Sequence, residues 1–206
     1  MTYVVEKIQT SHIEYHSDIK KSTFQTQYST IWAIGNIKIL STELFGFFCS
    51  VKCPGDIILK TYDFARTLRH AGINFISGFH SPIEKDVFDF LLSGSQSIVI
   101  CPARSIENMR IPKTWKENID KGRLLVFSPF ERKHKRVTAP LSEQRNRMVA
   151  LLAKKVFIPY AAPGGKSEDL CQDIIKSGNQ ILTFEDKANQ TLLRMGAKPI
   201  KTGELK

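Results

Sequence analysis

The chain lacks any long hydrophobic run. None of its windows approaches the roughly 20 apolar residues that a membrane-spanning helix requires, and its first residues contain no apolar signal segment. We therefore expect a cytoplasmic protein without a membrane partner. Cysteine is sparse as well, because the 206 residues contain four, widely spaced and without the paired spacing of a metal site. We expect reduced, mostly buried thiols, no metal and no other cofactor.

Patterns typical of hydrolytic enzymes are also missing. The sequence shows no Ser/His/Asp order and no paired carboxylates placed at the ends of predicted strands. His80 has no carboxylate or cysteine at a convincing spacing, so we interpret it as a loop histidine. No residue is assigned a catalytic role, and a binding protein is favoured over an enzyme.

What the sequence does contain is an excess of positive charge. Thirty lysines and arginines against twenty acidic residues give a formal net charge of +10. The stretch from Glu131 to Lys155 holds eight basic and two acidic residues and so carries +6 of this total. Such a distribution suggests a polyanionic partner, and a solvated basic loop is the alternative interpretation.

An alternation of apolar strands and amphipathic helices predicts the fold class. Apolar runs of strand length recur from Phe45 onward, and apolar residues at helical spacing follow them. The predicted strands lie at 45–49, 73–77, 97–101, 124–127, 156–158 and 180–184. Six such units predict an α/β fold with a mostly parallel sheet and helices on both faces. Residues 1–30 show no sustained periodicity and are interpreted as an N-terminal extension of a domain spanning 31–206.

One segment combines the features of a phosphate-binding turn. Arg145-Asn146-Arg147 lies on a predicted helix before a buried strand, and Pro163-Gly164-Gly165-Lys166-Ser167 then opens another helix. A glycine turn at a helix start presents backbone N–H groups and the positive helix end to an anion. Lys166 would add a mobile charge, Ser167 would cap the helix, and the arginines suit bidentate phosphate contacts. The glycine spacing is not that of a Walker P-loop.

Loops after the other strands complete the candidate site, because ligands of parallel sheets bind at the carboxyl ends of strands. We expect Ser50, Gly78, Arg145 and Gly165 to converge there. The rings of Phe79 and Phe130 would either stack on unpaired bases, a contact worth about 1–3 kcal/mol, or pack against the next helix. The candidate DNA- or phosphate-binding residues are Ser50, Lys52, Gly78, Phe79, Arg145, Asn146, Arg147, Gly164, Gly165, Lys166 and Ser167.

These segments resemble the DNA-processing protein family (DprA/Smf) over roughly residues 31–200. The similar motifs are, in order, 32–36, Ala71-Gly72, Ser77-Gly78, 120–125, Arg145-Asn146-Arg147 and Gly165-Lys166-Ser167. Arg-Asn-Arg before a strand and a small Gly/Ser turn is the most specific of them. The resemblance implies an extended Rossmann-like domain that binds single-stranded DNA, usually as a homodimer, and helps to load a RecA-type recombinase during natural transformation.

The chain departs from that family at two turns. Members carry Gly-Ser-Arg at the first turn, where this sequence has Cys49-Ser50-Val51 followed by Lys52. After the second strand they carry Arg-Gly-Ile-Asp, where this sequence has Phe79-His80-Ser81-Pro82-Ile83-Glu84. No C-terminal winged helix, common in the family, is expected within the 206 residues. A divergent single-domain member with an altered pocket fits these differences.

Two other functions remain open from the sequence. Pro163-Gly164-Gly165 also resembles the turn of lysine decarboxylase-like nucleotide phosphoribohydrolases, although those enzymes place Gly-Thr and then Glu after it. Nucleotide binding or hydrolysis is therefore the alternative to DNA binding, and a scaffold with a decayed pocket is the third possibility. For a homodimer, the apolar segment from Ile174 to Leu193 is the predicted surface.

Overall fold

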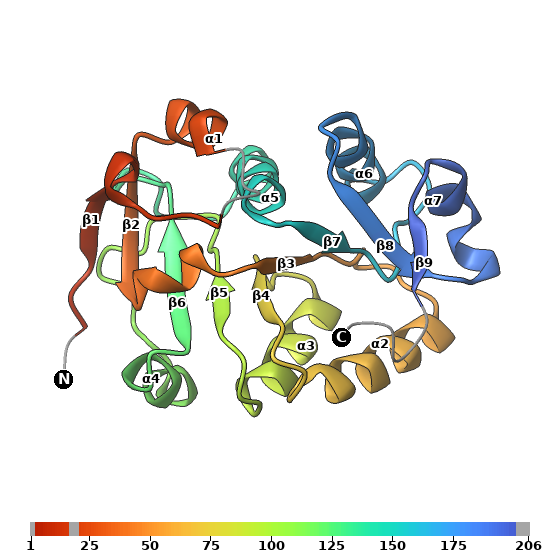
Figure 1. The fold of residues 1–206 in the computed structure, drawn as a ribbon, viewed down its shortest axis with the longest axis horizontal. Helices are drawn as coiled ribbons and strands as arrows, with labels where there is room; N and C mark the ends of the chain where they lie inside the picture. The colour runs from red at the N-terminus through yellow and green to blue at the C-terminus, as the bar shows by residue number, and fades with distance from the viewer. Residues whose placement is uncertain (1–2, 17–20, 201–206) are drawn as a thin grey trace.

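The chain forms a nine-stranded sheet within the residues that its computed structural model describes, 3–16 and 21–200 (Figure 1). The strand order is β1-β2-β6-β5-β4-β3-β7-β8-β9. The β1–β2 and β2–β6 pairs are antiparallel, and all other pairs are parallel. The strands are β1 (Glu6–Gln9), β2 (Thr30–Gly35), β3 (Leu44–Phe47), β4 (Asn74–Ser77), β5 (Ile98–Ile100), β6 (Leu124–Ser128), β7 (Lys155–Phe157), β8 (Gln180–Phe184) and β9 (Lys198–Ile200).

Helices cover both faces of this sheet, as predicted. They are α1 (Lys21–Gln27), α2 (Gly55–Leu68), α3 (Pro82–Leu92), α4 (Lys113–Asp120), α5 (Ala139–Leu152), α6 (Lys166–Lys176) and α7 (Gln190–Arg194). Figure 1 shows α1, α5, α6 and α7 on one face and α2, α3 and α4 on the other. The described part of the chain contains no helix with the length and hydrophobicity to span a bilayer.

Each face has its own hydrophobic cluster. Successive residues of a strand point to opposite faces, so Ile31 belongs to the cluster under α1, α5 and α6 while its neighbour Trp32 belongs to the other. The central strands β5 and β6 are buried along their whole length, since helices cover them on both sides. This explains why they read in the sequence as continuous apolar runs.

The described part of residues 1–30 forms a strand and a helix that pack on the domain. Strand β1 pairs with β2 at the edge of the sheet. Phe24 of α1 is fully buried, and its ring lies 6.4 Å from that of Phe127 in β6. This segment therefore shares the hydrophobic core of residues 31–200. Residues 1–2, 17–20 and 201–206, which belong to the two predicted segments, lie outside the described residues.

The apolar residues of the predicted dimer surface are used inside the chain. Ile174, Ile181 and Leu192 are each no more than 2% exposed and belong to the cluster under α5, α6 and α7. They are therefore not available to a second copy. Because these side chains belong to the core, they do not support a dimer surface at residues 174–193.

Candidate functional site

A buried carboxylate joins the turns that follow β3 and β4. Glu84, in the first turn of α3, accepts hydrogen bonds from Cys49 N (3.0 Å) through Oε1 and from His80 N (2.7 Å) through Oε2. Its own N–H donates to Ser81 Oγ and Ser81 N donates to Glu84 Oε2, and these two reciprocal bonds form a capping box at the start of α3. We missed Glu84 in the sequence, where the pattern Ser81-Pro82-Ile83-Glu84 was its signal.

Arg145 is buried at this same edge of the sheet and is not an exposed helix residue. It is 3% exposed, and its Nη1 donates to Cys101 O (2.8 Å) after β5. Its Nε donates to Asn146 Oδ1 (2.7 Å), so the asparagine side chain holds the arginine. A Cβ built at Gly78 would lie 1.5 Å from Arg145 Nη1, so only glycine leaves room for the guanidinium. Among the described residues, no hydrogen bond uses Nη2.

The buried guanidinium places a fixed positive charge at the end of β4 and β5. Burial lowers the pKa of Arg145, and the charge of Glu84 acts in the opposite direction. The pKa of arginine lies above 12 in water, so the side chain stays charged at neutral pH. Glu84 compensates part of the cost of burying that charge.

Arg145 reaches from α5 across the sheet edge into a cavity of about 550 Å³ on the α3–α4 side. We name this the Arg145 cavity. Its charged lining residues are Lys85, Asp89, Arg104 and Arg145, so positive charge exceeds negative. Trp115 of α4, half-buried against Phe88, supplies an aromatic wall. Lys85, Arg104 and Trp115 belong to no motif in the sequence, because they lie on separate elements that only the fold brings together.

The phenylalanines expected at strand ends pack inside the protein. Phe79 is 4% exposed, and its ring lies 4.7 Å from that of Phe88 in the following helix. Phe130 is 2% exposed and packs against His134. Of the two alternatives drawn from the sequence, packing against neighbouring side chains is what the structure shows. These rings are not exposed for stacking on a base.

The Gly-Gly turn is already occupied by a carboxylate of the chain. Gly164 N donates to Glu168 Oε2 (2.5 Å), so the N–H that we expected to bind an anion has an internal partner. Gly165 is the N-cap of α6, and no side chain caps this helix. The prediction that Ser167 caps it is wrong, because Ser167 lies within the first turn of α6.

Arg147 and Lys166 lie together in a second, smaller hollow between α5 and α6, of about 170 Å³. Arg147 Nε lies 3.3 Å from Asp173 Oδ2, and Lys166 Nζ lies 2.7 Å from Glu143 Oε1. Asp169 also lines this hollow, so three carboxylates face two cations. The predicted basic cradle is thus neutralised by carboxylates, and each ion-pair partner lies on the opposite helix, 23 residues from Lys166 and 26 residues from Arg147.

The crevice at the topological switch point is held closed. The chain runs from β3 through β4 and β5 to β6 on one side and then continues with β7 on the other side of β3. Doubly wound sheets bind ligands at such a point. Here Ser50 N donates to Tyr160 O (3.1 Å), and Ala162 N donates to Ser50 Oγ (2.9 Å), which joins the two loops. Lys52, two residues further on, is exposed.

The cysteines match the expectation of buried thiols. Cys49, Cys101 and Cys171 are buried, Cys53 is half-buried, and all four are unpaired. No three histidine, cysteine or acidic side chains of residues 3–16 and 21–200 gather to hold a metal ion.

Solved structures share this architecture. DNA processing protein A (DprA) from Streptococcus pneumoniae superposes with a TM-score of 0.77 at 17% identity, over 98% of this chain and 72% of that one. DNA processing protein A from Helicobacter pylori, in a study of its single-stranded DNA binding mode, gives 0.76 at 17% identity, over 96% and 91%. A molybdenum cofactor carrier protein from Chlamydomonas reinhardtii gives 0.54 at 9% identity, over 78% and 91%.

Comparison of the sequence with family models and with curated proteins finds no match. The structural likeness shows that the chain has a DprA-like, Rossmann-type fold. The resemblance drawn from the sequence motifs is confirmed at the level of the fold.

Proposed function

We propose that this chain binds single-stranded DNA along the carboxyl edge of its parallel sheet, with the Arg145 cavity as the centre of the contact. The observation that carries the proposal is Arg145, held against Gly78 and Cys101 with one terminal nitrogen left over. Lys85 and Arg104 add positive charge to the same cavity from two other elements. The fold shared with DNA processing proteins supports this proposal.

The arrangement of these charges on three separate elements favours a chain of phosphates over a single phosphate group. Lys85 comes from α3, Arg104 from the loop after β5 and Arg145 from α5. Phosphates along a flexible strand can reach separate cations, and the exposed part of Trp115 offers a surface on which a base can stack. A single nucleotide phosphate would instead need the Gly-Gly turn, where Glu168 occupies Gly164 N. No observation favours the nucleotide hydrolase alternative over DNA binding.

The other candidate residues contribute to DNA binding to different extents in this proposal. Lys52 is exposed after β3 and adds a positive charge for the DNA strand at the same edge of the sheet. Arg147 and Lys166 contribute less, because carboxylates already neutralise them. Ser50, Asn146 and the glycines shape the loops and hold Arg145. Homodimer formation and contact with a RecA-type recombinase, both implied by the sequence resemblance, stay predictions.

Fluorescence anisotropy with a labelled oligothymidylate tests the proposal. We expect binding that weakens steeply with salt, because each phosphate contact releases counterions and contributes about 0.7 to the logarithmic slope. Unlabelled oligonucleotides of mixed sequence should compete about equally, and AMP should not compete at equal phosphate concentration. Displacement by AMP with release of free adenine would favour the nucleotide hydrolase instead, and no binding at low salt would leave the scaffold interpretation.

A further inference from the structure

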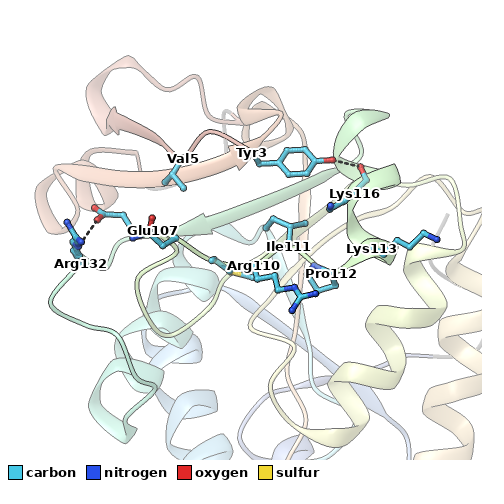
Figure 2. Close-up of a pocket in the computed structure, with 11 residues that line it drawn as sticks. Tyr3, Val5, Glu107, Arg110, Ile111, Pro112, Lys113, Lys116 and Arg132 are labelled. Carbon is cyan, nitrogen blue, oxygen red and sulfur yellow. Dashed lines mark hydrogen bonds and ion pairs between the residues drawn. The ribbon is translucent and has the colours of Figure 1, made fainter. Parts of the chain in front are cut away.

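A second positively charged cavity lies beside the Arg145 cavity and has no part in the site described so far. It measures about 860 Å³ and lies between the segment that leads into β1, the loop after β5 and the start of α4 (Figure 2). We name it the Arg110 cavity. Its charged lining residues are Glu107, Arg110, Lys113, Lys116 and Arg132.

Most positive charges of the Arg110 cavity have no acidic partner. Arg132 lies 4.0 Å from Glu107, so this ion pair is long and weak. Within the described part of the chain, Arg110, Lys113 and Lys116 form no ion pair. Four cations around one carboxylate repel each other, and a polyanion that entered the cavity would relieve this repulsion. This distinguishes the cavity from the hollow at Arg147 and Lys166.

Apolar side chains lie among these charges. Val5 and Ile111 face the cavity together with the aliphatic part of Met109, and the Tyr3 hydroxyl donates to Asp120 Oδ1 (2.7 Å) at its far end. A surface that combines apolar groups with cations suits a nucleic-acid strand, which carries both bases and phosphates. It suits a free inorganic anion less well.

One loop separates the two cavities, and Met109 lines both. This wall is fixed in place by hydrogen bonds. Ser128 Oγ donates to Arg104 O (2.8 Å), Ser105 N donates to His134 O (2.8 Å), and Ile106 is fully buried. The two cavities are therefore neighbours, and a ligand that extends beyond the Arg145 cavity at Met109 would enter the Arg110 cavity.

We propose that the Arg110 cavity is a second phosphate-binding site for the same single strand, which runs from the Arg145 cavity over Met109 toward Lys113 and Lys116. This inference rests on the proposed function and adds the path of the strand. The protein then has a long site made of two positive cavities joined at a ridge. A short oligonucleotide fills only the first cavity, and a longer one fills both.

A length series of oligothymidylates with the variant Lys113→Ala/Lys116→Ala tests this path. Wild-type affinity should rise with length until both cavities are filled. The variant should bind the shortest oligonucleotides as the wild type does and should lose affinity for long ones. Loss of two phosphate contacts should lower the salt slope for long oligonucleotides by about 1.4. Lys113 is exposed and Lys116 is half-buried on α4, so thermal unfolding should confirm an intact fold.

The matched control is Lys38→Ala/Lys121→Ala, which removes the same charge at the opposite, amino edge of the sheet. If the control and the test variant weaken long oligonucleotides equally, the effect is one of net charge and the path is wrong. Equal loss for short and long oligonucleotides would also contradict it. If the wild type binds no oligonucleotide of any length, the proposed function fails and this inference with it.

Discussion

The guanidinium of Arg145 packs so closely on Gly78 that no larger residue fits at position 78. The guanidinium lies against the glycine backbone, bonded to Cys101 O and to Asn146, and Glu84 lies close enough to influence its charge. The positive charge is therefore positioned before any ligand arrives. A fixed guanidinium loses little conformational freedom on binding a phosphate, whereas a surface lysine must be ordered first.

Gly78→Ala should expel this guanidinium. The added methyl group would overlap Arg145 Nη1, and overpacking of a buried site costs roughly 1–3 kcal/mol. We expect a lower free energy of unfolding in urea together with weaker single-stranded DNA binding. Gly55→Ala, where an added Cβ meets no atom within 4 Å, is the control and should lower neither the free energy of unfolding nor the affinity. Equal behaviour of the two variants would show that the packing of Arg145 on Gly78 does not matter.

At the scale of elements, ion pairs between helices decide which cations are free to bind. Lys166 is paired with Glu143 across α5 and α6, while Lys121, the C-cap of α4, is paired with Glu117 at the opposite edge of the sheet. We expect Lys166→Ala and Lys121→Ala to weaken single-stranded DNA binding to within about twofold of each other, because a carboxylate already neutralises each lysine. Anisotropy titrations at one salt concentration compare them. A much larger loss for Lys166→Ala would contradict this expectation and would indicate that the DNA binds at the Gly-Gly turn.

A second ion pair ties α2 to the loop after β8 and should make stability depend on pH. Asp186 accepts from Lys60 Nζ (2.5 Å) and from Ala188 N, and both contacts lower its pKa. A carboxyl whose pKa is depressed in the folded state stabilises the protein above its unfolded pKa, near 3.9, and loses this effect as the pH falls through the folded pKa. Asp186→Asn keeps a capping side chain and removes the charge.

We therefore expect Asp186→Asn to be less stable than the wild type at pH 7, by about 1 kcal/mol or less for an exposed pair. The difference should vanish as the pH falls through the lowered pKa of Asp186 in the folded state. Urea unfolding at several pH values measures it. A difference that stayed constant from pH 7 to pH 3 would show that the carboxylate charge is not its source.

The elements that the sequence predicted correctly share a physical feature. Strands β3 to β8 are covered on both faces, so each forms a short apolar run that can be recognised in the sequence. Strand β1 is exposed at the edge and carries charged and polar residues, which explains why residues 1–30 showed no periodicity. The capping box at Ser81 and Glu84 was visible in the sequence, but its link to Cys49 depends on the neighbouring turn.

For the whole molecule, the sequence located the charge but not the face that presents it. Arg145 and Arg147 are two residues apart, yet one is buried against Gly78 and the other is exposed and paired with Asp173. Those partners lie far away along the chain, so spacing in the sequence cannot reveal them. The fold gathers cations from separate elements on the α3–α4 side, in the Arg145 and Arg110 cavities.

The most direct test of the central claim is the salt dependence of single-stranded DNA binding by Lys85→Ala/Arg104→Ala, measured by anisotropy beside the wild type and Lys38→Ala/Lys121→Ala. Lys85 and Arg104 line the Arg145 cavity, whereas the control lysines lie at the amino edge of the sheet. We predict that the cavity variant lowers the salt slope by about 1.4, for two lost phosphate contacts, and that the control leaves it unchanged. Equal slopes for the wild type and both variants would contradict the account.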